Sequence, residues 1–230
     1  MNPRRLLRGS VMAVWAGFFL WLALSGEVVR YLGPRTYWVV WFGATVLGLA
    51  ALFHALTIRS GTRGSIRPTD VGGAFLLVLP LVVVLAVPQP DLGALAASRK
   101  TTGLATLSSS APRPAPQRGG PLDFAEIHYA SESTEYATAI GATDGAKVEL
   151  VGFVTHPKRA PEGTFALTRF YISCCAADAI PYSVYVVSTE DHPDDTWLKV
   201  TGRLAHLDGD LVVEPDTIAA VDKPRAPYLY

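Results

Sequence analysis

Three long apolar stretches, nearly free of charge, occupy most of the first ninety residues. They lie at about residues 10–31, 37–58 and 71–87. A helix needs roughly 20 apolar residues to cross a hydrocarbon core about 30 Å thick. The pattern therefore predicts three membrane helices, and we expect residues 1–90 to form a transmembrane domain with the lipid bilayer as its first partner.

The first stretch also resembles a secretory signal peptide. Arg4, Arg5 and Arg8 precede it, and residues 23–25 (Ala-Leu-Ser) offer a cleavage motif. Two further apolar stretches follow, so cleavage would not release the chain from the membrane. We favour an uncleaved helix over a cleaved signal.

The arginines predict how the helices are oriented. Three precede the first stretch and three more separate the second from the third, whereas Arg30 and Arg35, partly offset by Glu27, lie between the first and second. Basic residues favour cytoplasmic segments. We therefore expect a multi-pass cell-membrane protein with a cytoplasmic N-terminus and an extracytoplasmic C-terminal part. The spans carry no acid and base pair typical of an ion relay, which favours an anchor over a transporter.

Residues 91–121 form the predicted linker. From residue 98 onwards this segment reads SRKTTGLATLSSSAPRPAPQRGGP, which is rich in Ser, Pro and Gly and has few large apolar side chains. Such a composition is typical of a flexible or extended tether. A short helical patch is expected after it, at about residues 123–139.

The apolar period changes to two residues at Lys147. Five segments rich in Val, Thr, Tyr and Phe follow, at 147–156, 165–175, 182–188, 196–207 and 210–222, and they predict five strands. Gly152 and Gly202 lie inside two of these segments, where glycine often marks a bulge or a barrel corner.

The strand pattern predicts a small all-β domain over residues 122–230, folded as an OB-like five-stranded barrel. An open five-stranded sandwich is the alternative. The whole chain is thus predicted to be an α+β membrane protein, with three N-terminal helices and a C-terminal barrel.

Charge and motifs exclude several function classes. The chain carries 20 basic and 20 acidic residues, so the bulk charge argues against a nucleic-acid partner. The sequence contains no phosphate-binding glycine loop, no HExxH motif and no paired nucleophile and base. We expect a protein that is not an enzyme.

One cluster of chemically active residues stands out. The only two cysteines, Cys174 and Cys175, are adjacent, and Asp178 follows three residues later. If the strand ends before this segment, two soft sulfur ligands and one hard oxygen ligand can face one ion, as zinc or copper(I) sites require. His156 and His206, each near the end of a predicted strand, are candidates for a fourth ligand.

Other interpretations of the cluster stay open. One cysteine can be a small core residue, and the two can form a vicinal disulfide in an oxidising compartment or take part in thiol redox chemistry. Asp178 can be a turn residue bonded to the local backbone. Arg169, in the second predicted strand, is a candidate partner for Asp178.

The chain resembles the YcgQ-like family of permease-associated membrane proteins. The similarity lies in VELVGFVTHP, FALTRFYISCCAADAIP, WLKVTGRL and the closing PRAPYLY, and in the RYLGPR that follows the first apolar stretch. The resemblance implies a bacterial accessory subunit that works beside a larger multi-span permease. The resemblance implies that Cys174, Cys175 and Asp178 are the functional positions, and it points less directly to Arg169. An external domain that captures or presents a metal ion or small solute is the expected role, and a structural or interaction module is the alternative.

Overall fold

The computed structural model describes residues 3–57, 66–86, 92–104 and 121–230. Contacts within the chain divide it into two units. The helical unit is Met1–Asp91 together with Cys174–Ala176, and the barrel unit is Leu92–Ser173 together with Ala177–Tyr230. The short cysteine segment therefore belongs by its contacts to the helical unit.

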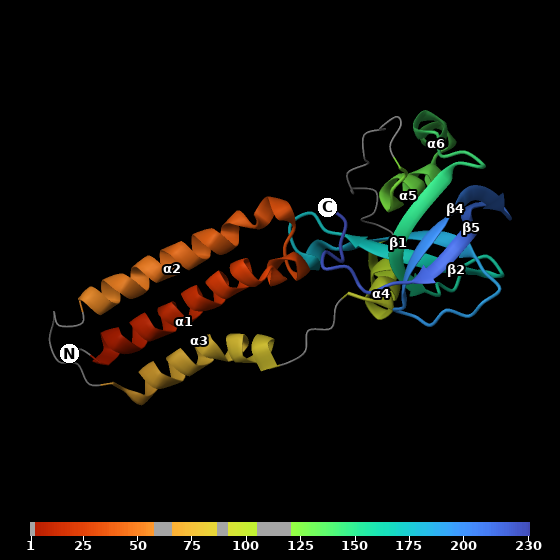
Figure 1. Cartoon of the computed structure of the whole chain (residues 1–230). Coiled ribbons are helices and arrows are strands. Elements are labelled where there is room, and N and C mark those ends of the chain that lie inside the picture. The colour runs from red at the N-terminus through yellow and green to blue at the C-terminus, as the bar shows by residue number, and fades with distance from the viewer. Residues whose placement is uncertain (1–2, 58–65, 87–91, 105–120) are drawn as a thin grey trace. The chain divides into compact units, whose positions relative to one another are not determined.

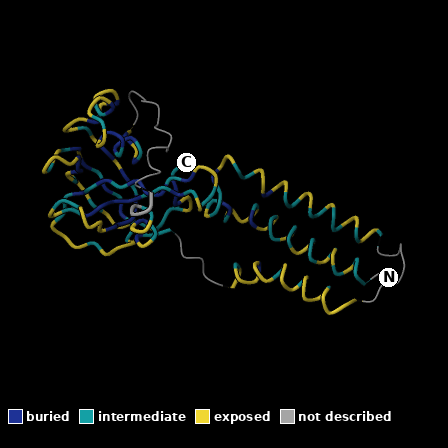
Figure 2. The backbone as a smooth tube through the Cα atoms, turned by 180° about the vertical axis from the view of Figure 1, so that it is seen from behind, coloured by how far each residue is buried: buried dark blue, intermediate teal, exposed yellow. Residues whose placement is uncertain are grey.

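The helical unit contains α1 (Pro3–Ser25), α2 (Trp38–Leu56) and α3 (Pro68–Ala86), which lie side by side (Figure 1). All three are long and apolar enough to cross a membrane. Large side chains such as Phe42, Leu49 and Phe75 are exposed, and the positions left exposed run along all three helices (Figure 2). An apolar exterior of this extent is typical of helices that face lipid.

The helix that contains most of the first predicted span begins and ends earlier than that prediction. It was expected at about residues 10–31, but α1 begins at Pro3 and ends at Ser25, and Glu27–Arg30 forms a 3₁₀ turn, η1. Gly26, in the left-handed conformation with φ 77°, ends α1 before Glu27. The polar residues before the apolar stretch form the first turns of α1. Arg4 forms an ion pair of 2.9 Å with Asp70 at the start of α3.

The barrel unit closes five strands in the order β1-β2-β3-β5-β4, with β4 pairing back onto β1. The strands are β1 (Lys147–Thr155), β2 (Thr164–Tyr171), β3 (Ile180–Val187), β4 (Trp197–Leu207) and β5 (Asp210–Ala220). The β3–β5 pair is parallel and the other pairs are antiparallel. Closure confirms the predicted OB-like barrel and excludes the open sandwich.

The barrel core follows the alternation of the strands. Inward-facing residues such as Leu150, Val184 and Val200 are at most 3% exposed. The helical patch predicted near residue 123 is present as α5 (Phe124–Glu132) and α6 (Thr134–Ile140), and these two helices pack on the same core. The β4–β5 turn uses Asp208 and Gly209, both with positive φ, as a tight two-residue hairpin requires.

The start of the predicted linker is helical. Ala94–Leu104 forms α4, whereas residues 98–121 were expected to be a tether; residues 105–120 of that tether lie outside the described residues. The apolar side of α4 explains its order, because Ala97 is buried in a cluster that includes Phe153 and Phe170. These two rings belong to the outer face of β1 and β2, which α4 covers.

We expect Gly202→Ala to destabilise the barrel. Strand β4 has a register shift between Thr201 and Gly202, and a Cβ atom at Gly202 would collide with the backbone carbonyl oxygen of Glu214 on β5. The backbone cannot move aside as a side chain can, so the overpacking is expected to lower the free energy of unfolding by about 1–3 kcal/mol. Denaturation of the full chain in mild detergent measures this loss. Arg203→Ala, on the same strand but exposed, is the matched control, and equal losses for the two variants would contradict the prediction.

Candidate metal site

The cysteine motif lies directly after β2, where the strand gives way to a turn. The last residue of β2 is Tyr171, and Ala176–Asp178 forms a 3₁₀ turn, η4. The backbone N–H of Ser173 donates a hydrogen bond of 3.0 Å to Oδ1 of Asp178. Asp178 therefore folds back over the turn, and the two cysteines are released from the strict alternation of a strand.

The two sulfur atoms have the spacing of metal ligands. Sulfurs that each lie about 2.3 Å from a tetrahedral ion are about 3.8 Å apart, and the Sγ atoms of Cys174 and Cys175 are 3.7 Å apart. A disulfide requires about 2.05 Å, so both residues are thiols in this structure. One ligand atom from each cysteine and one from Asp178 lie within 4.8 Å of one another. Cys174 is exposed and Cys175 is partly buried, so an ion would have access from solvent.

The backbone of the cysteine segment is held by the loop between α1 and α2. The Cys174 carbonyl accepts two hydrogen bonds, from the Gly33 N–H at 3.0 Å and from the Thr36 hydroxyl at 2.7 Å. The Ala176 N–H donates to the Tyr31 carbonyl at 2.8 Å. We call these three bonds the loop clamp. Since it fixes the backbone on both sides of Cys175, the clamp limits how far the two thiols can move apart.

A lysine from α4 supports the other end of the turn. The Nζ atom of Lys100 donates to the carbonyl of Ala179 at 2.7 Å and to that of Ala177 at 3.2 Å. These carbonyls flank Asp178. A helix end has carbonyl groups that its own backbone leaves unsatisfied. The ammonium group satisfies that of Ala177 in η4 and also that of Ala179 directly after it.

Comparison with known families identifies the chain. The model of a family described as the DUF1980 C-terminal domain matches residues 114–230, which is more than half of the chain. The chain belongs to the DUF1980 family. The match covers all five strands and the turn with Cys174, Cys175 and Asp178, and it fits the YcgQ-like resemblance of the sequence. No curated protein matches the chain.

Arg169 of the DUF1980 domain has a different role from the one expected. Instead of Asp178, its guanidinium contacts three backbone carbonyls, those of Val151, Ala226 and Pro227, at 3.3, 2.8 and 3.3 Å. Burial lowers the pKa of Arg169 below its usual value. Its position near the end of β2 directs the side chain to the C-terminal segment, so Arg169 fastens that segment to the barrel.

The two histidines proposed as fourth ligands are occupied elsewhere in the DUF1980 domain. Nδ1 of His156 lies 2.8 Å from Asp194, and Nδ1 of His206 lies 2.6 Å from Asp144. Within the part of the chain that the structure describes, the group that includes the cysteines contains only Asp178 besides them. A fourth ligand would then be water, the bound solute or a group from a partner protein.

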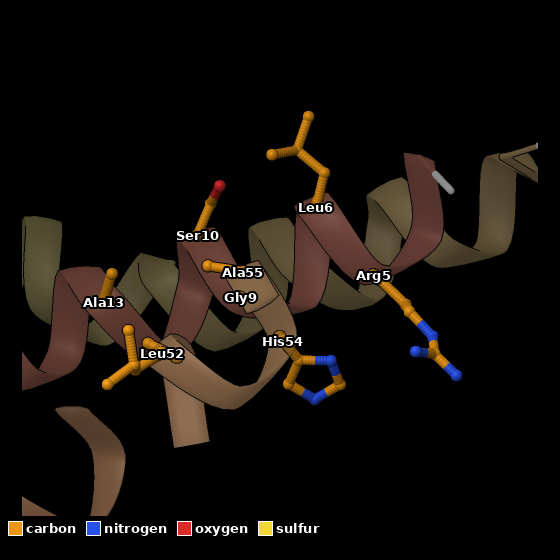
Figure 3. Close-up of a pocket in the computed structure, with 9 residues that line it drawn as sticks. Arg5, Leu6, Gly9, Ser10, Ala13, Leu52, His54 and Ala55 are labelled. Carbon is orange, nitrogen blue, oxygen red and sulfur yellow. The ribbon is translucent and has the colours of Figure 1, made fainter. Parts of the chain in front are cut away.

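A separate concavity of about 360 Å³ lies between α1 and α2 (Figure 3). Its walls are mainly apolar, from residues such as Leu6, Ala13 and Leu52. Nδ1 of His54 is buried and has no hydrogen-bond partner among the described residues, while Arg5 donates to the Thr57 carbonyl. Solute sites usually have several convergent polar groups, so this groove is a weaker candidate than the cysteine turn.

Proposed function

We propose that this protein is an accessory subunit of a membrane permease, of the kind that the YcgQ-like resemblance implies. Its barrel domain captures a metal ion or small thiol-reactive solute outside the cytoplasm and presents it to a larger, multi-span partner. The supporting observation is the 3.7 Å separation of the Cys174 and Cys175 sulfurs, with Asp178 beside them. No other described group of His, Cys, Asp and Glu side chains offers three ligand atoms so close together.

The ligand set favours zinc or copper(I). Two thiolates are soft ligands that select these ions, and a carboxylate suits zinc better than copper(I). Three protein ligands leave a fourth position open, as sites that exchange their bound group require. Exposure of Cys174 suits transfer to another protein. In this role the protein carries out no catalytic step.

The membrane helices suit the role of an anchor that holds such a subunit in the bilayer. Their one ion pair in the described residues, Arg4 with Asp70, joins the first turns of α1 and α3 rather than the middle of a span. A pathway for ions needs polar or charged groups at membrane depth. The permeation path would therefore belong to the partner.

Copurification from mild detergent tests the assembly. The tagged full-length protein is expected to recover a multi-span membrane protein, and Cys174→Ser/Cys175→Ser is expected to recover the same partner while losing bound metal. That pair of results separates capture from assembly. Failure to recover any multi-span protein across several detergents would count against the permease role.

A second function is favoured by one observation, the isolated antiparallel bridge between Leu32 and Cys175. This bridge pairs the cysteine segment with the loop that follows α1, as a structural connection would. In this alternative the protein is an interaction module of a membrane complex, and its cysteines serve packing. Equal metal content and equal stability of the wild type and of the double serine variant would favour this alternative.

Chemical labelling tests the predicted orientation, because Cys174 and Cys175 are the only cysteines in the chain. After treatment with a chelator, a membrane-impermeant maleimide is expected to label them in intact cells. The control is Cys174→Ser/Cys175→Ser with Arg63→Cys between α2 and α3, which should react only after the cells are permeabilised. The reverse pattern would place the barrel in the cytoplasm.

A further inference from the structure

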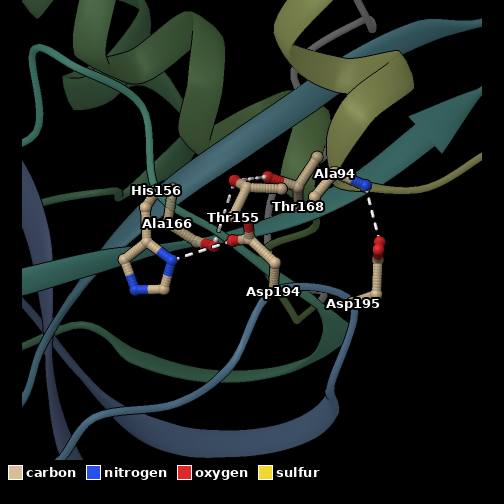
Figure 4. A network of polar contacts seen from close by, with 7 residues as sticks. All are labelled: Ala94, Thr155, His156, Ala166, Thr168, Asp194 and Asp195. Atoms are coloured by element: carbon tan, nitrogen blue, oxygen red, sulfur yellow. Dashed lines mark hydrogen bonds and ion pairs between the residues drawn. The ribbon is translucent and has the colours of Figure 1, made fainter.

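A second cavity, of about 280 Å³, lies in the barrel unit beside α4. One wall is α4 itself, and another is the end of β1 with the loop that precedes β4 (Figure 4). Its polar lining consists of Ser98, Thr155, His156, Ser183, Asp194 and Asp195. The Ser98 hydroxyl donates a hydrogen bond of 2.9 Å to the Leu95 carbonyl of its own helix. Water occupies about 30 Å³ per molecule in the liquid, so the cavity has roughly the volume of nine waters. It is large enough for a small organic molecule.

A ladder of hydroxyl groups runs under this cavity across three strands. The Oγ1 atoms of Thr155 and Thr168 are 2.8 Å apart, and the Thr168 Oγ1 is 2.8 Å from the Oγ of Ser183. Thr168 is fully buried, so its hydroxyl is satisfied only within the ladder. Each hydroxyl can rotate to donate in either direction. The terminal Ser183, which lines the cavity, can therefore donate to a ligand or accept from it.

Two carboxylates give the cavity a negative charge. Asp194 lies 2.8 Å from Nδ1 of His156, and Oδ1 of Asp195 accepts a hydrogen bond of 2.6 Å from the Ala94 N–H at the start of α4 (Figure 4). These contacts hold both side chains in place, and each carboxylate keeps further lone pairs for a ligand. No lysine or arginine is among the lining residues. Even with His156 protonated, the lining has a net negative charge.

The apolar wall limits the class of ligand further. It consists of Ala94, Leu95 and Ala97 from α4, together with Pro157. A hydrated metal ion would gain nothing from such a wall, because apolar surface is buried favourably only against an apolar group. The lining therefore suits a molecule that has a positive charge at one end and a short hydrocarbon body at the other.

We propose that this cavity binds a small organic ammonium compound. The ammonium group donates hydrogen bonds to Asp194, Asp195 and the Ser183 hydroxyl, and the hydrocarbon body packs on α4. This site is separate from the cysteine turn and does not depend on the metal role proposed for it.

The test measures how tightly n-butylamine binds to the full chain in a nonionic detergent. This amine is positively charged at neutral pH. n-Butanol, with the same number of heavy atoms and no charge, is the matched probe. A charge-assisted hydrogen bond contributes about 1.5–3 kcal/mol, so the amine should bind about tenfold more tightly than the alcohol, or more. Asp194→Asn should remove most of that preference, and Ser183→Ala part of it.

The control is Asp191→Asn, which makes the same charge change in the same loop outside the cavity, and it should keep the preference for the amine. The proposal fails if the wild type binds the two probes equally or binds neither at the limit of solubility. It also fails if Asp194→Asn and Asp191→Asn have equal effects. Circular dichroism and the thermal midpoint check that each variant is folded; if Asp194→Asn unfolds, an unchanged preference in Ser183→Ala overturns the proposal.

Discussion

Replacing both cysteines by serine, Cys174→Ser/Cys175→Ser, is expected to lower the affinity of the full-length protein for zinc or copper(I) by more than about 100-fold. Loss of a group that merely orients a ligand typically costs 10–100-fold in affinity, and this change removes two of the three ligands themselves. Serine hydroxyls are not thiolates at neutral pH and are poor ligands for these ions. Competition with a chromophoric chelator, on protein purified in detergent, measures the change.

Two further variants make this prediction specific to the turn. Asp178→Asn keeps an oxygen ligand but removes its charge, so a smaller loss, of about tenfold, is expected. His206→Gln removes a residue that is paired with Asp144 outside the cluster, and it should leave the affinity unchanged. If the double serine variant binds as tightly as the wild type, the cysteines are not ligands and their role is packing.

The barrel was predictable from the sequence because strand patterns are local. Alternation of apolar residues locates all five strands, and Gly202 marks the irregular point of β4, since its neighbour on β5 leaves no space for a side chain. Closure was also predictable, because five short strands with two glycine bends favour a barrel over an open sheet.

The helices were harder to predict where tertiary contacts decide the outcome. The charged start of α1 looked like a flank of the span, but it is part of the helix, where Arg4 pairs with Asp70 from α3. The start of the predicted linker looked unable to pack, yet Ala97 is buried against the outer face of the barrel. Composition describes a segment by itself and says nothing about the surface that it meets.

Some contacts of the candidate site could likewise be predicted from the sequence, and others could not. Cys174, Cys175 and Asp178 lie within five consecutive positions, so the sequence alone was enough to group them. Arg169 was a candidate partner for Asp178, but its position in β2 directs it to the C-terminal segment instead.

Groups that come from distant segments could not be found in this way. The ladder of Thr155, Thr168 and Ser183 comes from three strands, and each residue looks like an ordinary strand position. The loop clamp joins residues 138 positions apart, Thr36 and Cys174. The only signal of the clamp was the RYLGPR segment, which the family resemblance singled out without indicating its contacts.

Gly33→Pro tests the clamp by removing one of its backbone donors. Gly33 has φ −77° and ψ 156°, which proline adopts without strain, but proline has no N–H to donate to the Cys174 carbonyl. Gly33→Ala keeps that N–H and is the matched control. If the clamp positions the thiols, Gly33→Pro should lower the metal affinity by about tenfold, the lower end of the effect of an orienting group, and Gly33→Ala should leave it unchanged.

Thr36→Val removes the second donor to the same carbonyl and nearly preserves the side-chain shape, so it should have a similar effect. Combined with Gly33→Pro, it leaves the Cys174 carbonyl without either of its clamp bonds. The double variant should then also react faster with a thiol reagent, since the segment is held less firmly. Equal affinities and equal thiol reaction rates for the proline, valine and alanine variants would show that the clamp connects the chain without setting the geometry of the site.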